Sequence, residues 1–156
     1  MKNKTCCFTG HRKISKDEYV EIKKCLFEEI EKLISKGVCY FETGGALGFD
    51  TLAALAVLEL RETHSHIKLI LILPCKEQTR GWQEEDKKIY GQILSKADKT
   101  VYASENYFRG CMQKRNRNLV DESSFCICYL NKPVGGTAYT VEYAKKQGLC
   151  IINIAE

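Results

Sequence analysis

Strand-like and helix-like patterns alternate along the whole chain, and this alternation constrains the fold more than any other feature of the sequence. Short apolar runs are separated by longer segments in which apolar residues recur every three or four positions. Such alternation is typical of β-α-β units, in which parallel strands are joined by helices that pack on the sheet. We therefore predict an α/β fold, a Rossmann-like three-layer sandwich with a mostly parallel sheet of about six strands.

The predicted elements fill the chain without a linker, a repeat or a low-complexity segment. The first helix follows a capping box formed by Ser15 and Glu18, and Gly37 ends it. A length of 156 residues is typical of one domain, so we predict a single domain over residues 1–156. The predicted strands are 4–9, 38–43, 67–73, 99–103, 125–131 and 150–154, and the later helices are 50–62, 82–96, 112–122 and 136–147.

Charge and cysteine content exclude several classes of protein. A net charge of +4 is too small for a dedicated nucleic-acid binder, although it is compatible with phosphate-bearing ligands. The chain has nine cysteines, an odd number, and no two of them form a C-x-x-C pair. We therefore predict neither a disulfide framework nor a metal site. Six of the cysteines fall in predicted strands, where cysteine acts as a small apolar residue. These six are Cys6, Cys7, Cys39, Cys126, Cys128 and Cys150.

Neither a secretory signal nor a membrane span is expected. The first residues have no apolar core of the kind a signal peptide needs. The longest apolar stretch, residues 67–74, contains Lys68 and is too short to cross a bilayer. We therefore predict a cytoplasmic protein with no membrane partner.

Unusual residues gather in the loops that follow the predicted strands. In a parallel sheet these loops share the carboxyl edge, where ligands bind beside the point at which strand order reverses. His11, Arg12, Arg80 and both prolines fall in the same set of loops. The sequence therefore predicts a working site at the carboxyl edge. Eight of the 11 glycines lie there: Gly10, Gly44, Gly45, Gly48, Gly81, Gly110, Gly135 and Gly136.

Two of these loops are glycine-rich and open directly into a helix. In residues 43–50 and in Gly135-Gly136-Thr137, backbone N–H groups are predicted to approach an anion at the positive end of a helix dipole. The first loop has Thr43 where a nicotinamide fingerprint has glycine, and no Walker sequence occurs. Asp50 reads as the N-cap of its own helix, as a binding residue, or as both.

Several polar residues near these loops carry two interpretations each. Arg115 and Asn116 belong to a solvated basic helix face or to a bidentate phosphate contact. His11 is suited to acid–base work near neutral pH, but the sequence gives it no partner. Trp82, close to Gln78 and Arg80, is suited to stacking on a base or to anchoring its helix.

Five motifs in chain order resemble the YpsA-like family of the SLOG superfamily. They are FTGHR at 8–12, TGGALGFD at 43–50, LPCKEQ at 73–78, MQKRN at 112–116 and GGTAYTVE at 135–142. The superfamily includes the DNA-processing protein DprA and the LOG phosphoribohydrolases. The resemblance implies a Rossmann-like fold that binds a nucleotide or a nucleotide-derived ligand, and it implies no settled reaction.

By resemblance to LOG enzymes, Arg115 and Glu142 take the places of the arginine and the glutamate that hydrolyse an N-glycosidic bond. The chain departs from the LOG pattern at Asn116, Val134, Ala138 and Tyr139, which replace lysine, proline, glycine and threonine. These departures alter the phosphate cradle. The resemblance therefore leaves open whether the chain is an enzyme.

We expect binding or sensing of a nucleotide-derived small molecule, such as a nucleoside monophosphate or an ADP-ribose-like ligand. The alternative is a LOG-like phosphoribohydrolase that uses Glu142 and Arg115, and a weaker alternative is DprA-like binding of single-stranded DNA. No cofactor is certain, and a homodimer is one outcome because enzymes of the superfamily are commonly dimers. The expected binding residues are Gly10, His11, Arg12, Gly44, Gly45, Gly48, Asp50, Gln78, Arg80, Arg115, Asn116, Gly135, Gly136 and Thr137.

Overall fold

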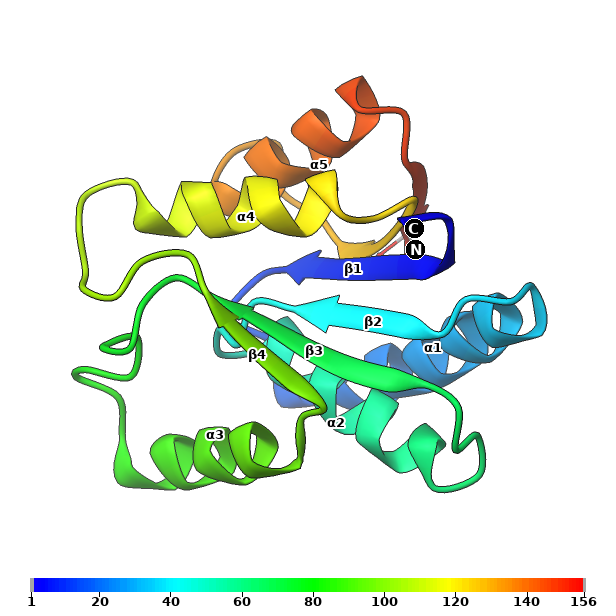
Figure 1. Cartoon of the computed structure of the whole chain (residues 1–156), viewed down its shortest axis with the longest axis horizontal. Coiled ribbons are helices and arrows are strands. Elements are labelled where there is room, and N and C mark those ends of the chain that lie inside the picture. Colours follow the sequence, from blue (N-terminus) through cyan, green and yellow to red (C-terminus); the bar gives the residue numbers. More distant parts are fainter. Residues whose placement is uncertain (1, 156) are drawn as a thin grey trace.

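A computed structural model of the chain describes residues 2–155, which form a six-stranded sheet and five α-helices (Figure 1). A short 3-10 helix, Lys2–Lys4, precedes the sheet. The strands are β1 (Thr5–Gly10), β2 (Tyr40–Thr43), β3 (Lys68–Leu73), β4 (Lys99–Tyr102), β5 (Phe125–Tyr129) and β6 (Cys150–Asn153). The helices are α1 (Lys16–Ser35), α2 (Phe49–Arg61), α3 (Glu84–Lys96), α4 (Cys111–Asp121) and α5 (Gly136–Lys146).

The sheet has the strand order β4-β3-β2-β1-β5-β6, and every neighbouring pair in the described chain is parallel. Helices α1, α2 and α3 cover one face, and α4 and α5 lie on the other (Figure 1). The predicted three-layer Rossmann-like fold is confirmed, with a sheet that is parallel throughout rather than mostly parallel. The chain leaves β1 toward β2, β3 and β4 and then crosses to β5, so strand order reverses between β1 and β5.

Alternate side chains of β1 pack into the two separate cores. Phe8 is buried on the side of α1–α3, where its ring lies 6.2 Å from that of Phe41 and 6.4 Å from that of Phe49. Cys7 points to the other side and packs beneath α4 and α5. Burial of each large apolar side chain contributes about 1.5–3 kcal/mol, so β1 is anchored on both faces. This anchoring fixes the segment that follows it, Gly10–Arg12.

Most element boundaries agree with the predicted ones to within two residues. The capping box at α1 is confirmed, because the Glu18 Oε1 atom accepts hydrogen bonds from the backbone N–H and the hydroxyl of Ser15. Cys39 was wrongly placed in a strand: β2 begins one residue later, and Cys39 is only half-buried. Cys150 lies in β6 but is exposed, so it is not a core residue. Among residues 2–155, no helix is long and apolar enough to cross a membrane.

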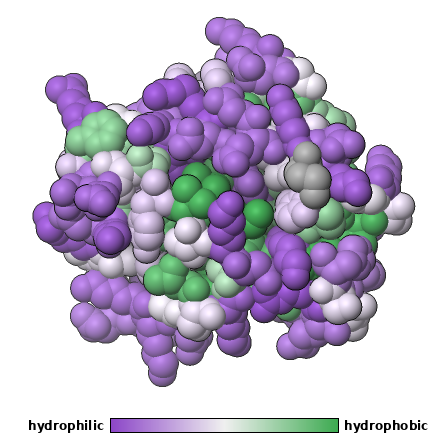
Figure 2. Space-filling model, in the orientation of Figure 1, coloured by the Kyte–Doolittle hydropathy of each residue, from purple (hydrophilic) through white to green (hydrophobic). Residues whose placement is uncertain are grey.

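Part of the sheet is left open on the side of α4 and α5. These two helices pack mainly on β1, β3, β5 and β6, and no residue of the edge strand β4 is fully buried. Apolar residues are visible at the centre of this face, over β3 and β4, surrounded by hydrophilic residues (Figure 2).

Glu42 of β2 is buried beside a cavity of about 500 Å³, and within the described chain its Oε1 atom has no hydrogen-bond partner. Burial raises the pKa of Glu42 to about 8, the Glu122 charge adds to this, and Lys99 opposes it.

We expect Glu42→Gln to stabilise the protein at alkaline pH. Because the pKa of Glu42 rises from 4.5 to about 8 on folding, the native state holds a proton that the unfolded state releases, and stability falls as pH rises through this window. The neutral amide removes that loss, which amounts to roughly 2–4 kcal/mol. Urea unfolding at about pH 5 and about pH 9 measures the difference. Glu122→Gln is the control, since it removes only the neighbouring charge and should recover part of the effect. Equal pH slopes in Glu42→Gln and the unaltered protein would contradict this prediction.

Candidate functional site

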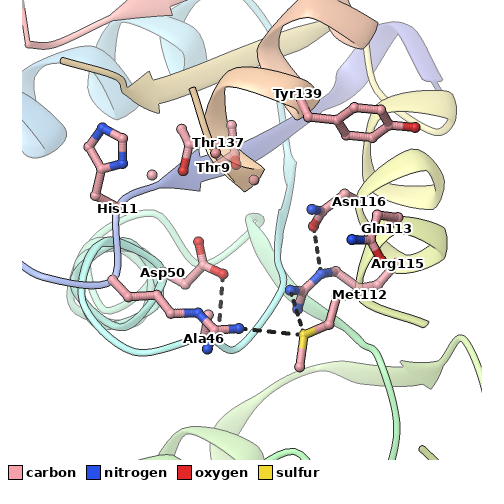
Figure 3. A pocket seen from close by; sticks show the side chains of 14 residues that line it. Thr9, His11, Ala46, Asp50, Met112, Gln113, Arg115, Asn116, Thr137 and Tyr139 are labelled. Carbon is pink, nitrogen blue, oxygen red and sulfur yellow. Dashed lines mark hydrogen bonds between the residues drawn. The ribbon is translucent and has the colours of Figure 1, made fainter. Parts of the chain in front are cut away.

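A cavity of about 480 Å³ opens at the carboxyl edge of the sheet, beside the point where strand order reverses (Figure 3). Four segments build it: the end of β1 with the two residues after it, the loop before α2 with the first turn of that helix, the first turns of α4 and the start of α5. The lining residues are Thr9, Gly10, His11, Arg12, Ala46, Asp50, Met112, Gln113, Arg115, Asn116, Gly135, Gly136, Thr137 and Tyr139.

Arg115 is a buried cation at the wall of this cavity, with 4% of its surface exposed. Its Nη1 donates to the Gly44 carbonyl and, at 3.4 Å, to Gln78 Oε1, while its Nε donates to Asn116 Oδ1 at 2.7 Å. Nη2 donates only to the Met112 sulfur, at 3.8 Å, among the described residues. Burial lowers the pKa of Arg115, and the charge of Asp50 opposes that shift. Since a guanidinium stays protonated at physiological pH, Nη2 keeps N–H groups for an anionic ligand.

Asp50 does not cap its helix, and this interpretation of the sequence was wrong. The N-cap of α2 is Gly48, and Asp50 sits buried in the first turn, where its Oδ2 accepts the Ala46 N–H at 3.2 Å. Burial raises the pKa of Asp50, whereas Arg115 and the N–H groups of the loop lower it. The loop predicted to cradle an external anion is therefore occupied, at least in part, by a carboxylate of the protein itself.

The glycines of that first loop serve close packing. A Cβ at Gly44 would lie 2.8 Å from the Arg115 Cζ atom, and one at Gly48 would overlap the Arg12 carbonyl. None of the glycines between Thr43 and Asp50 lines the cavity. At the end of β1, Gly10 lines it, and a Cβ there would lie 2.5 Å from Phe49 Cβ. The structure thus brings only part of the predicted glycine set into the cavity.

The second glycine-rich loop opens into the cavity. Gly135 is the N-cap of α5, and Gly136 and Thr137 are its first residues. All three line the cavity, and a Cβ at either glycine would meet nothing within 4 Å. The first N–H groups of a helix have no partner within it and carry the positive end of its dipole. The start of α5 therefore presents free donors to the cavity, across from the side chains that come from α4 (Figure 3).

His11 has a partner that the sequence could not show. Its Nε2 accepts the backbone N–H of Asn131 at 3.1 Å, and its ring lies 6.0 Å from that of Tyr129. An accepting Nε2 places the ring proton on Nδ1. Burial, followed by the charge of Lys132, lowers the pKa of His11, and Glu18 opposes this. His11 is thus a neutral hydrogen-bond donor at neutral pH.

Besides Gly44, Gly45 and Gly48, three further predicted residues lie outside the cavity. Gln78 is buried behind Arg115, and Arg80 pairs with Glu77 at 2.6 Å near the surface. Glu142 is exposed on α5 and does not line the cavity. Sequence reasoning missed Met112 as a lining residue. Met112 precedes Arg115 by three residues, so the two side chains share one face of the helix, and this spacing could have predicted its position. Sequence reasoning also missed Thr9, Ala46, Gln113 and, as a lining residue, Tyr139.

Within residues 2–155, no group of three or more histidine, cysteine, aspartate or glutamate side chains is arranged to hold a metal ion.

Comparison of the sequence with known families and proteins gives consistent matches. The YspA SLOG family matches over residues 6–149. A UPF0398 protein of Halalkalibacterium halodurans is 36% identical over 129 residues, which cover 81% of this chain and 68% of that protein. The protein YoqJ of Bacillus subtilis, described as an uncharacterized SPbeta prophage-derived protein, is 34% identical over 140 residues. The match covers 81% of this chain and 82% of YoqJ.

Two solved structures of DprA share the fold. DprA from Streptococcus pneumoniae matches with a TM-score of 0.69 and 18% identity, over 96% of this chain and 50% of that chain. DprA from Helicobacter pylori, described with a single-stranded DNA binding mode, matches with a TM-score of 0.68 and 19% identity, over 94% and 63%. This chain thus spans about half to under two thirds of the DprA chains, and the likeness at this identity concerns the fold alone.

Proposed function

The chain belongs to the YspA SLOG family, as its five motifs predicted, and from this premise we propose that it binds a nucleotide or nucleotide-derived ligand in the carboxyl-edge cavity. A nucleoside monophosphate and an ADP-ribose-like molecule are the two forms that the proposal includes. A volume of about 480 Å³ lies in the range of small-molecule and cofactor sites.

The observation that carries the proposal is the convergence of anion-binding groups on one cavity. The start of α5 supplies N–H groups at Gly136 and Thr137, and Arg12 and Arg115 add two guanidinium groups. Within the described chain no carboxylate lies within 4.0 Å of either guanidinium. A phosphate in the cavity would pair with both charges and with the helix terminus. Its binding would also offset the cost of keeping Arg115 buried.

A second candidate function, N-glycoside hydrolysis, is favoured by the position of Asp50. A LOG-like reaction needs a carboxylate beside the sugar, and Asp50 lines the same cavity as Arg115 whereas Glu142 does not. In this version Asp50 activates water or stabilises the positively charged sugar, and Arg115 holds the phosphate. Release of free base from a nucleoside monophosphate should then be lost in Asp50→Asn and retained in Glu142→Gln. Equal release in all three proteins would exclude this role of Asp50.

A thermal-shift screen tests the binding proposal directly. The ligands are nucleoside 5′-monophosphates, ADP-ribose, NAD, inorganic phosphate and a single-stranded oligodeoxynucleotide. A ligand at 100 times its dissociation constant adds about 2.7 kcal/mol, which corresponds to roughly 5–10 °C in a domain of this size. Stabilisation by a mononucleotide or by ADP-ribose is the expected result. Stabilisation by the oligodeoxynucleotide alone would replace the proposal by DNA binding, and no stabilisation by any ligand would reject it.

A further inference from the structure

A second cavity, of about 340 Å³, adjoins the first at the carboxyl edge. The two cavities share Arg12 and Met112 as lining residues, and Arg12 Nη2 donates to Met112 Sδ at 3.4 Å, so this contact separates them. The rest of the second cavity comes from the loops that follow β3 and β4. Its lining residues are Arg12, Cys75, Glu77, Gln78, Arg80, Trp82, Tyr107 and Met112.

Two aromatic rings line this second cavity. Trp82 is half-buried and held by Tyr90 of α3, with ring centroids 5.5 Å apart at 87°. Trp82 precedes α3 and packs on a residue of that helix, and it also lines the cavity. Tyr107 is 62% exposed, and its backbone N–H donates to Glu77 Oε1 at 3.2 Å, which ties its loop to the other side of the cavity.

The charged groups of the second cavity are mostly engaged by one another. Glu77 accepts Arg80 at 2.6 Å as well as the Tyr107 N–H, so the charge of Arg80 is paired with a carboxylate. Gln78 is buried and hydrogen-bonded to Arg115 and Tyr90. What remains for a ligand is two aromatic rings, the Met112 thioether and the flat Arg12 guanidinium. All of these groups stack on or pack against nucleobases, and only the Arg12 guanidinium among them also binds a phosphate.

We propose that the second cavity is the base subsite of a nucleotide whose phosphate lies at the start of α5 in the first cavity. The planar base packs against Trp82 and Tyr107, and Arg12 lies between base and phosphate, where it contacts both. This inference rests on the proposed function and narrows it: the ligand is a nucleotide recognised through its base, and a sugar phosphate fills only half of the site.

Trp82 is the single tryptophan of the chain, so all tryptophan fluorescence comes from a side chain that lines the second cavity. The experiment titrates the protein with AMP and with ADP-ribose, and ribose 5-phosphate serves as the base-free control. Excitation at the red edge of the tryptophan band avoids the tyrosines. We expect AMP or ADP-ribose to quench Trp82 fluorescence with the same dissociation constant as in calorimetry. Ribose 5-phosphate should bind more weakly and leave the fluorescence unchanged.

Two variants measure the contribution of the stack. Tyr107→Leu and Trp82→Leu should each weaken AMP binding about tenfold, with little change for ribose 5-phosphate. Tyr107 is mostly exposed, so its replacement leaves the fold intact even if Trp82→Leu disturbs the contact with Tyr90. Tyr19→Leu is the matched control, because Tyr19 is an exposed tyrosine of α1 that lines neither cavity at this edge.

The outcomes separate this inference from the proposed function. If AMP and ribose 5-phosphate bind equally well and Trp82 fluorescence is unchanged, the nucleotide site stands and the base subsite is wrong. If calorimetry detects no binding of any of the three compounds and the thermal-shift screen finds no stabilisation by any of its ligands, both proposals are rejected together.

Discussion

Gly48→Ala is expected to destabilise the native state by roughly 2–5 kcal/mol, the largest stability loss that we predict for any single methyl group added to this chain. Gly48 has a φ of +76°, which L-residues with a side chain adopt only at a cost. The added Cβ would also overlap the Arg12 carbonyl and lie 2.7 Å from the carbonyl oxygen of His11. These are backbone atoms, and the Phe49 N–H holds the His11 carbonyl at 3.1 Å, so they cannot move aside freely. Urea unfolding measures the loss.

Gly81→Ala is the matched control for this prediction. Gly81 has a similar φ of +84°, but a Cβ there meets nothing within 4 Å. Its replacement therefore carries only the backbone cost, about 1–2 kcal/mol. The difference between the two variants isolates the steric cost of the contact with residues 11 and 12. Equal losses would mean that the loop relaxes and that this contact contributes nothing.

The fold was predictable because local patterns determine it. Apolar periodicity distinguishes strands from helices, and short strands alternating with helices leave few arrangements other than a parallel sheet. The Ser15–Glu18 capping box also depends only on residues three positions apart. The carboxyl edge as the place of the cavity follows from the same reasoning, because the loops after parallel strands share that edge.

The details of the cavity depend on long-range contacts that no local pattern reports. A glycine permits close approach of any group, so TGGALGFD reads as an anion cradle until the structure places Arg115 against Gly44 and Asp50 on the Ala46 N–H. Likewise, the partner of His11 is the backbone of Asn131, from a loop 120 positions away. Side-chain orientation explains the position of Glu142: its spacing from Gly136 matches the LOG motif, yet α5 turns its side chain outward.

Arg115→Ala is expected to weaken binding of a phosphate-bearing ligand roughly 100-fold, since each charged hydrogen bond that is lost costs about 1.5–3 kcal/mol. The variant should also unfold more easily, because the buried Gly44 carbonyl and Gln78 lose their donor. Calorimetry on the folded protein measures the affinity and urea unfolding measures the stability. Arg115→Lys keeps the charge but lacks the fork of donors, and we expect it to recover part of the stability and little of the affinity.

Arg117→Ala is the control that separates charge from position. Arg117 lies two residues along the same helix and donates to Tyr139 Oη at 3.4 Å, but it does not line the cavity. Both variants remove one positive charge from α4, so any effect of net charge on an anionic ligand is common to them. A role of Arg115 in the fold alone would lower the stability of Arg115→Ala and leave its affinity equal to that of Arg117→Ala. If Arg115 contacts the phosphate directly, Arg115→Ala should bind the ligand roughly 100-fold more weakly than Arg117→Ala at equal ionic strength.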